Sequence, residues 1–222
     1  MTLYIVATPI GNLGDVTFRA VETLKTVDLI VAEDTRQTKK LLDRYEIKTG
    51  LATIHQHSQV SKLEQMIARM KNGESIALVS DAGTPNISDP GGELVEMTRQ
   101  AGIQVVPIPG ASAVTTILSV AGIPSDSFMF VGFLPKKKGR QTLLKEMANL
   151  DVPIVFFESP NRIAKTLVEL NQYLGDRELV IGRELTKMYE EILKLPTTEA
   201  MKHFSQHVPK GEFVIVITLN YN

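Results

Sequence analysis

The sequence has no cysteine and almost no excess of charge of either sign. Without thiols, its 222 residues can form neither disulfides nor thiolate metal sites, which fits a reducing compartment. Its 24 Lys and Arg against 25 Asp and Glu give a net charge of -1, which argues against a broad nucleic-acid-binding surface but allows a local basic patch. Any run of about 18 apolar residues and any signal-peptide pattern at the start are also missing, so we expect a cytoplasmic protein that does not enter a membrane.

Several widespread motifs are missing as well. No G-x-G-x-x-G and no G-x-x-x-x-G-K-[ST] occurs, which excludes a standard dinucleotide fingerprint and a P-loop. The segment 110–114 departs from the G-x-S-x-G nucleophile elbow at its last position, which disfavours a serine hydrolase. His55 and His57 would point to one face of an expected strand, but with four histidines and no cysteine we expect them to form hydrogen bonds rather than to bind a metal.

Short apolar runs alternate with amphipathic segments along the whole chain, which indicates βαβ units and an α/β fold with a mostly parallel sheet. The expected strands are 3–8, 29–33, 75–81, 104–109, 128–133, 153–158, 178–182 and 213–219, with 190–195 ambiguous. The expected helices are 17–26, 35–45, 62–71, 93–101, 112–121, 141–149, 163–173 and 198–205. A turn-rich segment at 122–127 predicts two domains, 1–121 and 122–222.

Three loops rich in Gly, Pro or Ser follow strands of the first half, at 8–15, 80–92 and 107–113. Ligands of open α/β sheets bind beyond the carboxyl ends of the strands, and Gly lets the backbone approach them closely. In these loops Asp81 offers acceptors for ribose hydroxyls or an amine, and Ser112 lies at a helix start. Each loop alone also fits an ordinary tight turn, but together they predict a small-cofactor site.

Charged residues follow other strands. The segment 32–36 contains carboxylates and Arg36 that could bind a substrate, although Asp34 could equally cap the next helix. The segment 183–187 fits either a structural ion pair or a catalytic role. The densest basic run is 136–140, which is either a solvated loop or a contact for nucleic acid.

In order along the chain, these segments resemble the tetrapyrrole-methylase superfamily of S-adenosylmethionine-dependent methyltransferases, and the resemblance covers essentially all residues. The segments that carry it are Thr8-Pro9-Ile10-Gly11-Asn12-Leu13 with Asp15, Ala32-Glu33-Asp34-Thr35-Arg36, Ser80-Asp81-Ala82-Gly83-Thr84-Pro85 with Ser88-Asp89-Pro90-Gly91, Phe133-Leu134-Pro135 with the lysines, Glu158-Ser159-Pro160 with Arg162, Arg183-Glu184-Leu185-Thr186-Lys187, and Gly211-Glu212-Phe213.

The resemblance implies two α/β/α domains, with a mostly parallel sheet in the first, a mixed sheet in the second, and S-adenosylmethionine in the cleft between them. It is strongest to the branch that 2′-O-methylates a decoding-region cytidine of 16S ribosomal RNA, and it implies a homodimer without a metal. The cofactor-site residues that it implies are Pro9, Asp81, Ala82, Gly83, Thr84, Ser112 and Ala113, with Phe157 and Arg183 from the second domain. The RNA-binding candidates are Arg36, Lys136, Lys137, Lys138 and Arg140.

A ribose hydroxyl is a weak acid, so a base beside it would assist methyl transfer. Glu33, Asp34 and Glu184 are candidates for this base, and Lys187 could lower the pKa of the hydroxyl electrostatically. The sequence does not choose among them.

The chain departs from the branch in three places. Its segment 57–59 reads His-Ser-Gln where His-Asn-Glu is usual, and Asn86 replaces a larger apolar residue. Relatives also carry a small C-terminal extension beyond the position of Asn222, and we expect RNA affinity to be the property most affected by its loss. Two other functions stay open, a methylase of a small tetrapyrrole precursor and a non-catalytic RNA-binding module. The basic loop disfavours the first, and the intact Asp81-Ala82-Gly83 segment disfavours the second.

Overall fold

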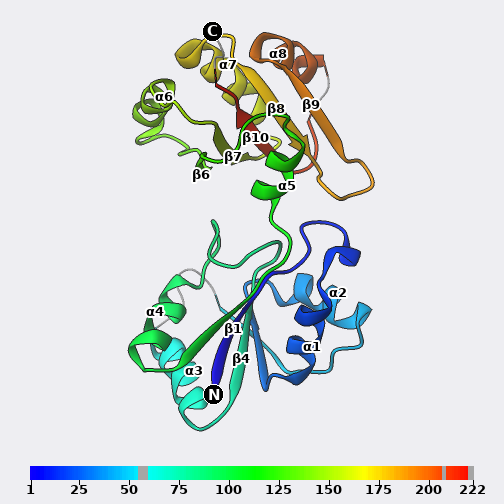
Figure 1. Ribbon diagram of the computed structural model, residues 1–222, viewed down its shortest axis with the longest axis vertical. Helices are drawn as coiled ribbons and strands as arrows, with labels where there is room; N and C mark the ends of the chain where they lie inside the picture. Colours follow the sequence, from blue (N-terminus) through cyan, green and yellow to red (C-terminus); the bar gives the residue numbers. More distant parts are fainter. Residues whose placement is uncertain (55–59, 207–208, 220–222) are drawn as a thin grey trace. The chain divides into compact units, whose positions relative to one another are not determined.

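The computed structural model describes residues 1–54, 60–206 and 209–219, so the residues His55 to Gln59 discussed above lie outside the described part. The chain forms two compact units, Met1–Ser112 and Ala113–Asn222 (Figure 1). The sequence predicts a domain boundary between residues 121 and 122. Helix α5 (Ala113–Val120) nevertheless belongs with the second unit, because it contacts strands β10 and β8 there.

The first unit is a parallel five-stranded sheet in the order β3-β2-β4-β1-β5. Its strands are β1 (Thr2–Val6), β2 (Leu29–Ala32), β3 (Leu51–Thr53), β4 (Ser75–Val79) and β5 (Gln104–Ile108). Its helices are α1 (Phe18–Thr26), α2 (Thr35–Arg44), α3 (Val60–Lys71) and α4 (Gly92–Gln100), and a 3-10 turn covers Leu13–Asp15. The short strand β3 is not among the strands that the sequence predicts.

Helices cover both faces of this sheet, as the ribbon shows (Figure 1). On one face, Leu3 and Leu78 pack with buried residues of α3 and α4. On the other, Val6 and Ile30 pack with buried residues of α1 and α2. A sheet buried on both faces explains why its strands are nearly continuous apolar runs. Since all five strands are parallel, their carboxyl ends lie at one edge.

The second unit is a mixed sheet in the order β6-β7-β10-β8-β9, in which only β6 and β7 pair in parallel. Its strands are β6 (Met129–Phe133), β7 (Ile154–Glu158), β8 (Glu178–Arg183), β9 (Glu191–Pro196) and β10 (Phe213–Ile217). Besides α5, its helices are α6 (Arg140–Ala148), α7 (Ile163–Leu174) and α8 (Thr197–Gln206). Residues of α6, α7 and α8 bury one face of the sheet, and Ile117 of α5 approaches the other face at Gly182.

This architecture confirms the predicted fold class, a mostly parallel sheet followed by a mixed one. It also settles the ambiguous segment 190–195, which is largely strand β9. Among the described residues, no helix is both long and apolar enough to span a membrane.

Candidate active site

The loops that follow β1 and β4 are joined by backbone hydrogen bonds. Thr8 and Gly83 form an antiparallel bridge in which each N–H donates to the carbonyl of the other, at 2.9 and 3.0 Å. The Thr8 hydroxyl also donates to the carbonyl of Ser80 at 3.1 Å. Gly83 has a φ of 77°, and a Cβ there would lie 3.3 Å from Ile10 Cγ2. This junction therefore requires Gly83, because other residues rarely adopt such a φ.

The loop that follows β5 is held against the other two. The Thr84 hydroxyl donates to the carbonyl of Ala111 at 3.3 Å, and the N–H of Ala7 donates to the carbonyl of Ile108 at 3.1 Å. Gly110 lies so close to Ala7 that a Cβ would be 3.0 Å from the Ala7 Cβ. The structure thus brings the three predicted loops of the first unit together at one edge.

Asp34 and Asp81 connect the end of β2 to this junction, since the Asp34 N–H donates to Asp81 Oδ1 at 2.9 Å. The Asp34 carboxylate caps α2 by accepting from the Arg36 N–H at 2.9 Å, and the Arg36 guanidinium contacts it at 3.0 and 2.7 Å. These bonds to Arg36 lower the pKa of Asp34 to about 2. A carboxylate of that pKa is a weak base, so the geometry favours the capping role of Asp34.

Asp89 is a half-buried carboxyl group in the segment that continues from the β4 loop. Burial raises its pKa to about 6, and the negative charges of Glu33 and Asp81 act in the same direction, although a hydrogen bond from Ser80 opposes them. The sequence analysis quoted Asp89 only as part of a motif. Burial is the property that distinguishes it, and the local sequence gave no signal for that.

The backbone around Asp89 is unusual. Asn86 and Ser88 have φ angles of 71° and 66°, and Gly91 has 128°. Asn86 Oδ1 is buried, finds no hydrogen-bond partner among the described residues, and would lie 2.6 Å from a Cβ at Gly91. The Asn86 side chain thus occupies the space beside Gly91 that a side chain at that position would otherwise fill.

In the second unit, Glu184 and Lys187 form an ion pair at 2.9 Å, and Lys187 Nζ also contacts Glu212 Oε2 at 2.9 Å. Glu184 further accepts from the Glu212 N–H at 2.9 Å. Burial opposes ionisation of both groups, but these bonds prevail, so the pKa of Glu184 is lowered and that of Lys187 is raised. Glu184 is therefore ionised and already bound, which suits a structural role in the loop after β8.

The two residues expected to complete the cofactor site lie in the second unit. Arg183 is ion-paired with Glu191 at 2.9 Å across β8 and β9. Phe157, near the end of β7, is partly buried against Phe130 and Phe133. Of the residues expected on the first unit's side, Ser112 ends that unit and Ala113 begins α5.

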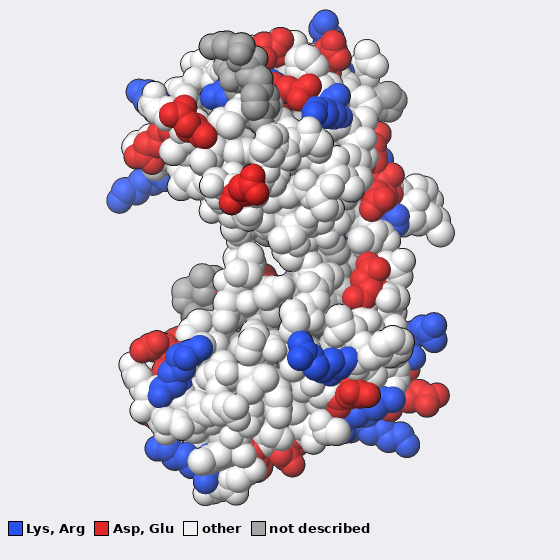
Figure 2. Space-filling model, in the orientation of Figure 1, with Lys and Arg blue, Asp and Glu red and all other residues white. Residues whose placement is uncertain are grey.

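The basic run divides into exposed and buried members. Lys136, Lys137 and Lys138 are exposed, whereas Arg140 is 5% exposed. The Arg140 guanidinium contacts Glu169 at 2.6 Å and Thr166 at 2.7 Å, so it is not available to an RNA phosphate. On the face shown in Figure 2, basic and acidic residues are interspersed, with no broad surface of one sign.

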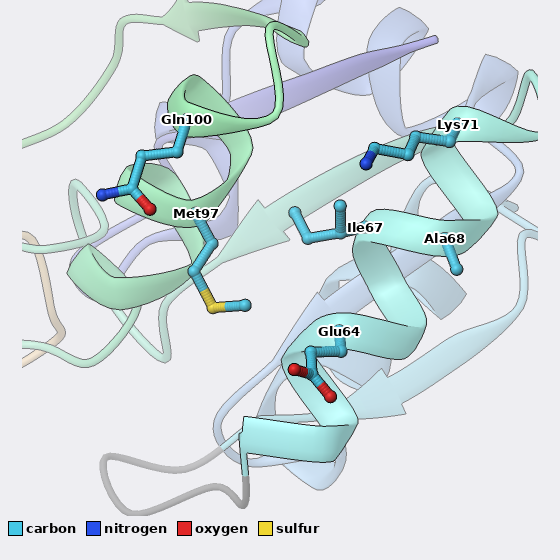
Figure 3. A pocket seen from close by; sticks show the side chains of 6 residues that line it. All are labelled: Glu64, Ile67, Ala68, Lys71, Met97 and Gln100. Carbon is cyan, nitrogen blue, oxygen red and sulfur yellow. The ribbon is translucent and has the colours of Figure 1, made fainter.

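A shallow hollow of about 290 Å³ lies between α3 and α4 (Figure 3). Its lining residues are Glu64, Ile67, Ala68, Lys71, Met97 and Gln100. None is a predicted site residue, and the hollow belongs to the helical face of the sheet rather than to its carboxyl edge. In the part of the chain that the structure describes, no group of three or more His, Asp or Glu residues is placed to hold a metal ion.

Comparison with known proteins identifies the family. The profile of the tetrapyrrole (corrin/porphyrin) methylases matches residues 2–200. The chain belongs to this family. Among solved structures, diphthine synthase matches with a TM-score of 0.79 at 13% identity over 100% of this chain and 92% of that one. Cobalt precorrin-4 methyltransferase matches with a TM-score of 0.71 at 18% identity over 97% and 94%. At these identities the structures establish the fold of this family member.

Relatives of higher identity share one name, ribosomal RNA small subunit methyltransferase I. The protein from Halalkalibacterium halodurans is 50% identical, over 99% of this chain and 76% of its own length. The protein from Synechocystis sp. is 49% identical over 97% and 78%. The protein from Thermotoga maritima is 45% identical over 97% of both chains.

Proposed function

We propose that this methylase uses S-adenosylmethionine to methylate the ribose 2′ oxygen of a decoding-region cytidine in 16S ribosomal RNA. The observation that carries the proposal is the junction of three loops at the carboxyl edge of the first sheet. It is supported by similarity, at 49–50% identity over nearly the whole chain, to proteins named as small-subunit RNA methyltransferases. The structural neighbours with tetrapyrrole substrates are far less similar in sequence.

The residues at the junction fit the proposed cofactor. Asp81 is exposed and can accept hydrogen bonds from ribose hydroxyls or from an amine. Ala82 is exposed beside Asp81, while Gly83 and Thr84 hold the loop against Thr8 and Ala111, so we assign all three residues to the site. Pro9 is buried against the same edge. We also assign Ser112, the last residue of the same unit, to this site.

When bound, the cofactor supplies a methyl group on a positively charged sulfur, which leaves as a neutral thioether. The protein then has to hold the ribose oxygen in line with the carbon–sulfur bond, and such positioning contributes several kcal/mol. It also has to accept the proton of the hydroxyl. Asp89 suits that task better than Asp34, because a base acts best when its pKa lies near the working pH.

The test is transfer of a labelled methyl group from S-adenosylmethionine to two acceptors, small ribosomal subunits that lack the modification and tetrapyrrole precursors. A reaction without any acceptor serves as the blank. We expect label in the ribosomal RNA alone. Gly83→Val should abolish transfer, because it forces a branched side chain and an unfavourable φ into the junction. Label in the tetrapyrroles, or no label anywhere from the folded protein, would contradict the proposal.

A further inference from the structure

Three phenylalanines form an aromatic cluster on the second sheet: Phe130 and Phe133 of β6 and Phe157 of β7. The ring centroid of Phe157 lies 5.0 Å from that of Phe130 and 5.5 Å from that of Phe133, with interplanar angles of 66° and 60°. Phe133 and Phe157 are also partners in the parallel pairing of the two strands.

A bulge brings the two rings of β6 to the same neighbour. Residues three apart in a regular strand point to opposite faces, so Phe130 and Phe133 would not both meet Phe157. The register of β6 shifts between these two residues, and Gly132 between them has a φ of 63°. Bulges of this kind commonly redirect a side chain at a sheet edge.

The cluster lies at the less covered end of one face. Across the sheet, Gly182, Val214 and Phe157 are paired in one row, and Phe133 continues it on the edge strand. Helix α5 covers the row at Gly182 through Ile117. Exposure increases towards the edge strand β6, since Phe157 is partly buried and Phe133 is 53% exposed.

The exposed ring is followed within a few residues by the exposed lysines 136–138. Two arginine side chains hold the backbone of the loop between them. Arg140 donates to the carbonyl of Pro135 at 3.1 Å, and Arg162 donates to the carbonyl of Leu134. Both guanidiniums are themselves held by carboxylates, Arg140 by Glu169 and Arg162 by Glu158. These bonds hold in place the backbone that links the exposed ring to the exposed lysines.

We propose that Phe133 stacks on an unpaired base of the RNA substrate while the neighbouring lysines contact its phosphates. A single-stranded nucleic acid offers the base faces and phosphates that match this combination, and proteins bind it through aromatic rings beside positive charge. The inference rests on the proposed function and adds a residue that positions the substrate. Phe157 packs against the Phe133 ring and is the more buried of the two side chains.

The experiment measures binding of the protein to small ribosomal subunits over a range of salt concentrations, together with kcat and KM for methyl transfer. Phe133→Ala should weaken binding by about 5- to 150-fold, the range for loss of one stacked base. The salt dependence should keep the parent's slope, because no phosphate contact is lost. KM for the subunits should rise with little change in kcat, and Phe133→Trp should restore binding.

Phe128→Ala is the matched control, since Phe128 is 39% exposed and lies at the opposite end of β6 from the lysines. It should bind as the parent does. Unchanged binding in Phe133→Ala would overturn the inference. So would loss of S-adenosylmethionine affinity, which would make the ring a cofactor contact, or a changed oligomeric state, which would make it an interface between copies.

The outcomes also separate this inference from the proposed function. If the parent methylates small subunits and Phe133→Ala matches it, the inference alone is wrong. If the parent binds the subunits without methylating them and Phe133→Ala binds more weakly, the function is wrong and the stacking contact stands. If the parent does not bind the subunits, both are wrong.

Discussion

Asp89 has a raised pKa that suits proton transfer from a ribose hydroxyl better than the lowered pKa of Asp34 does. Its pKa of about 6 follows from its burial beside Glu33 and Asp81, whereas Asp34 is held near 2 by Arg36. Both aspartates lie in loops that follow neighbouring strands of the first unit, Asp34 after β2 and Asp89 between β4 and α4, yet their surroundings move their pKa values in opposite directions. Such a division often marks a site where only one carboxyl takes part in proton transfer.

Asp89→Asn should reduce kcat for RNA methylation by about 10²- to 10⁴-fold, the usual contribution of a general base. In the parent, kcat should rise between pH 5 and pH 7 with a midpoint near 6, and the variant should lose this rise. Initial rates at saturating substrate across this pH range provide the measurement. Asp126→Asn, at an exposed carboxyl, is the control. A variant that keeps the parent's pH profile would exclude Asp89 as the base.

The same variant has a second readout in stability. The folded-state pKa of Asp89 is raised from 3.8 to about 6, so the native state binds more protons than the unfolded state between these values. Stability contributed by the neutral carboxyl is therefore full at low pH and is lost as the pH rises through 6. Asp89→Asn should leave the melting temperature unchanged at pH 4 and raise it by about 2–4 °C at pH 8, or roughly 1 kcal/mol for a half-buried group.

At single positions, the sequence predicts the chemistry of a side chain but not its environment. Arg140 belongs to a basic run and was expected on the surface, but it is buried by Thr166 and Glu169, residues far along the chain. Asp89 and Asp34 look alike in sequence, and only tertiary burial and the position of Arg36 separate them. Capping of α2 by Asp34 was predictable, because it depends on neighbours two residues apart.

Among the elements, the loop between β6 and α6 connects the fold most directly to the RNA proposal. Its lysines are exposed, while Arg140 and Arg162 fix its backbone. Changing Lys136, Lys137 and Lys138 together to Ala should weaken binding to small subunits. It should also flatten the log–log salt dependence by about two or three units, since each neutralised phosphate contributes roughly 0.7 to 0.9. Affinity for S-adenosylmethionine should be unchanged.

A variant with Lys25, Lys48 and Lys71 changed to Ala is the matched control, because it removes the same charge from exposed positions of the other unit. Its salt slope should equal the parent's. If the two triple variants lose the same affinity and slope, binding depends on net charge alone and the loop is an ordinary solvated turn. The contact would then have to be sought near Arg36.

Most elements were predictable because each consists of an apolar run or an amphipathic stretch bounded by turn residues. Strand β3 was missed because it has three residues, none of them fully buried. The position of α5 was missed for another reason. The turn at 122–127 ends that helix, but its place in the second unit depends on contacts with β10 and β8, which local sequence does not encode.

For the whole molecule, family membership and the loop junction both support methyl transfer from S-adenosylmethionine. The fold is shared with enzymes named for different activities, including diphthine synthase and cobalt precorrin-4 methyltransferase, so the fold alone does not select a substrate. Similarity at 45–50% identity to proteins named as small-subunit RNA methyltransferases favours ribosomal RNA. The first unit supplies the proposed cofactor loops, and the second supplies the proposed RNA-binding loop.

The central claim is that the ribose oxygen of a cytidine receives the methyl group. Its most direct test is mass spectrometry of the nucleosides from small subunits treated with the protein and S-adenosylmethionine, with untreated subunits as the control. We expect one new methylated nucleoside, 2′-O-methylcytidine, with its extra mass on the sugar fragment. A methyl group on the base fragment, or on the ribose of another nucleoside, would contradict it.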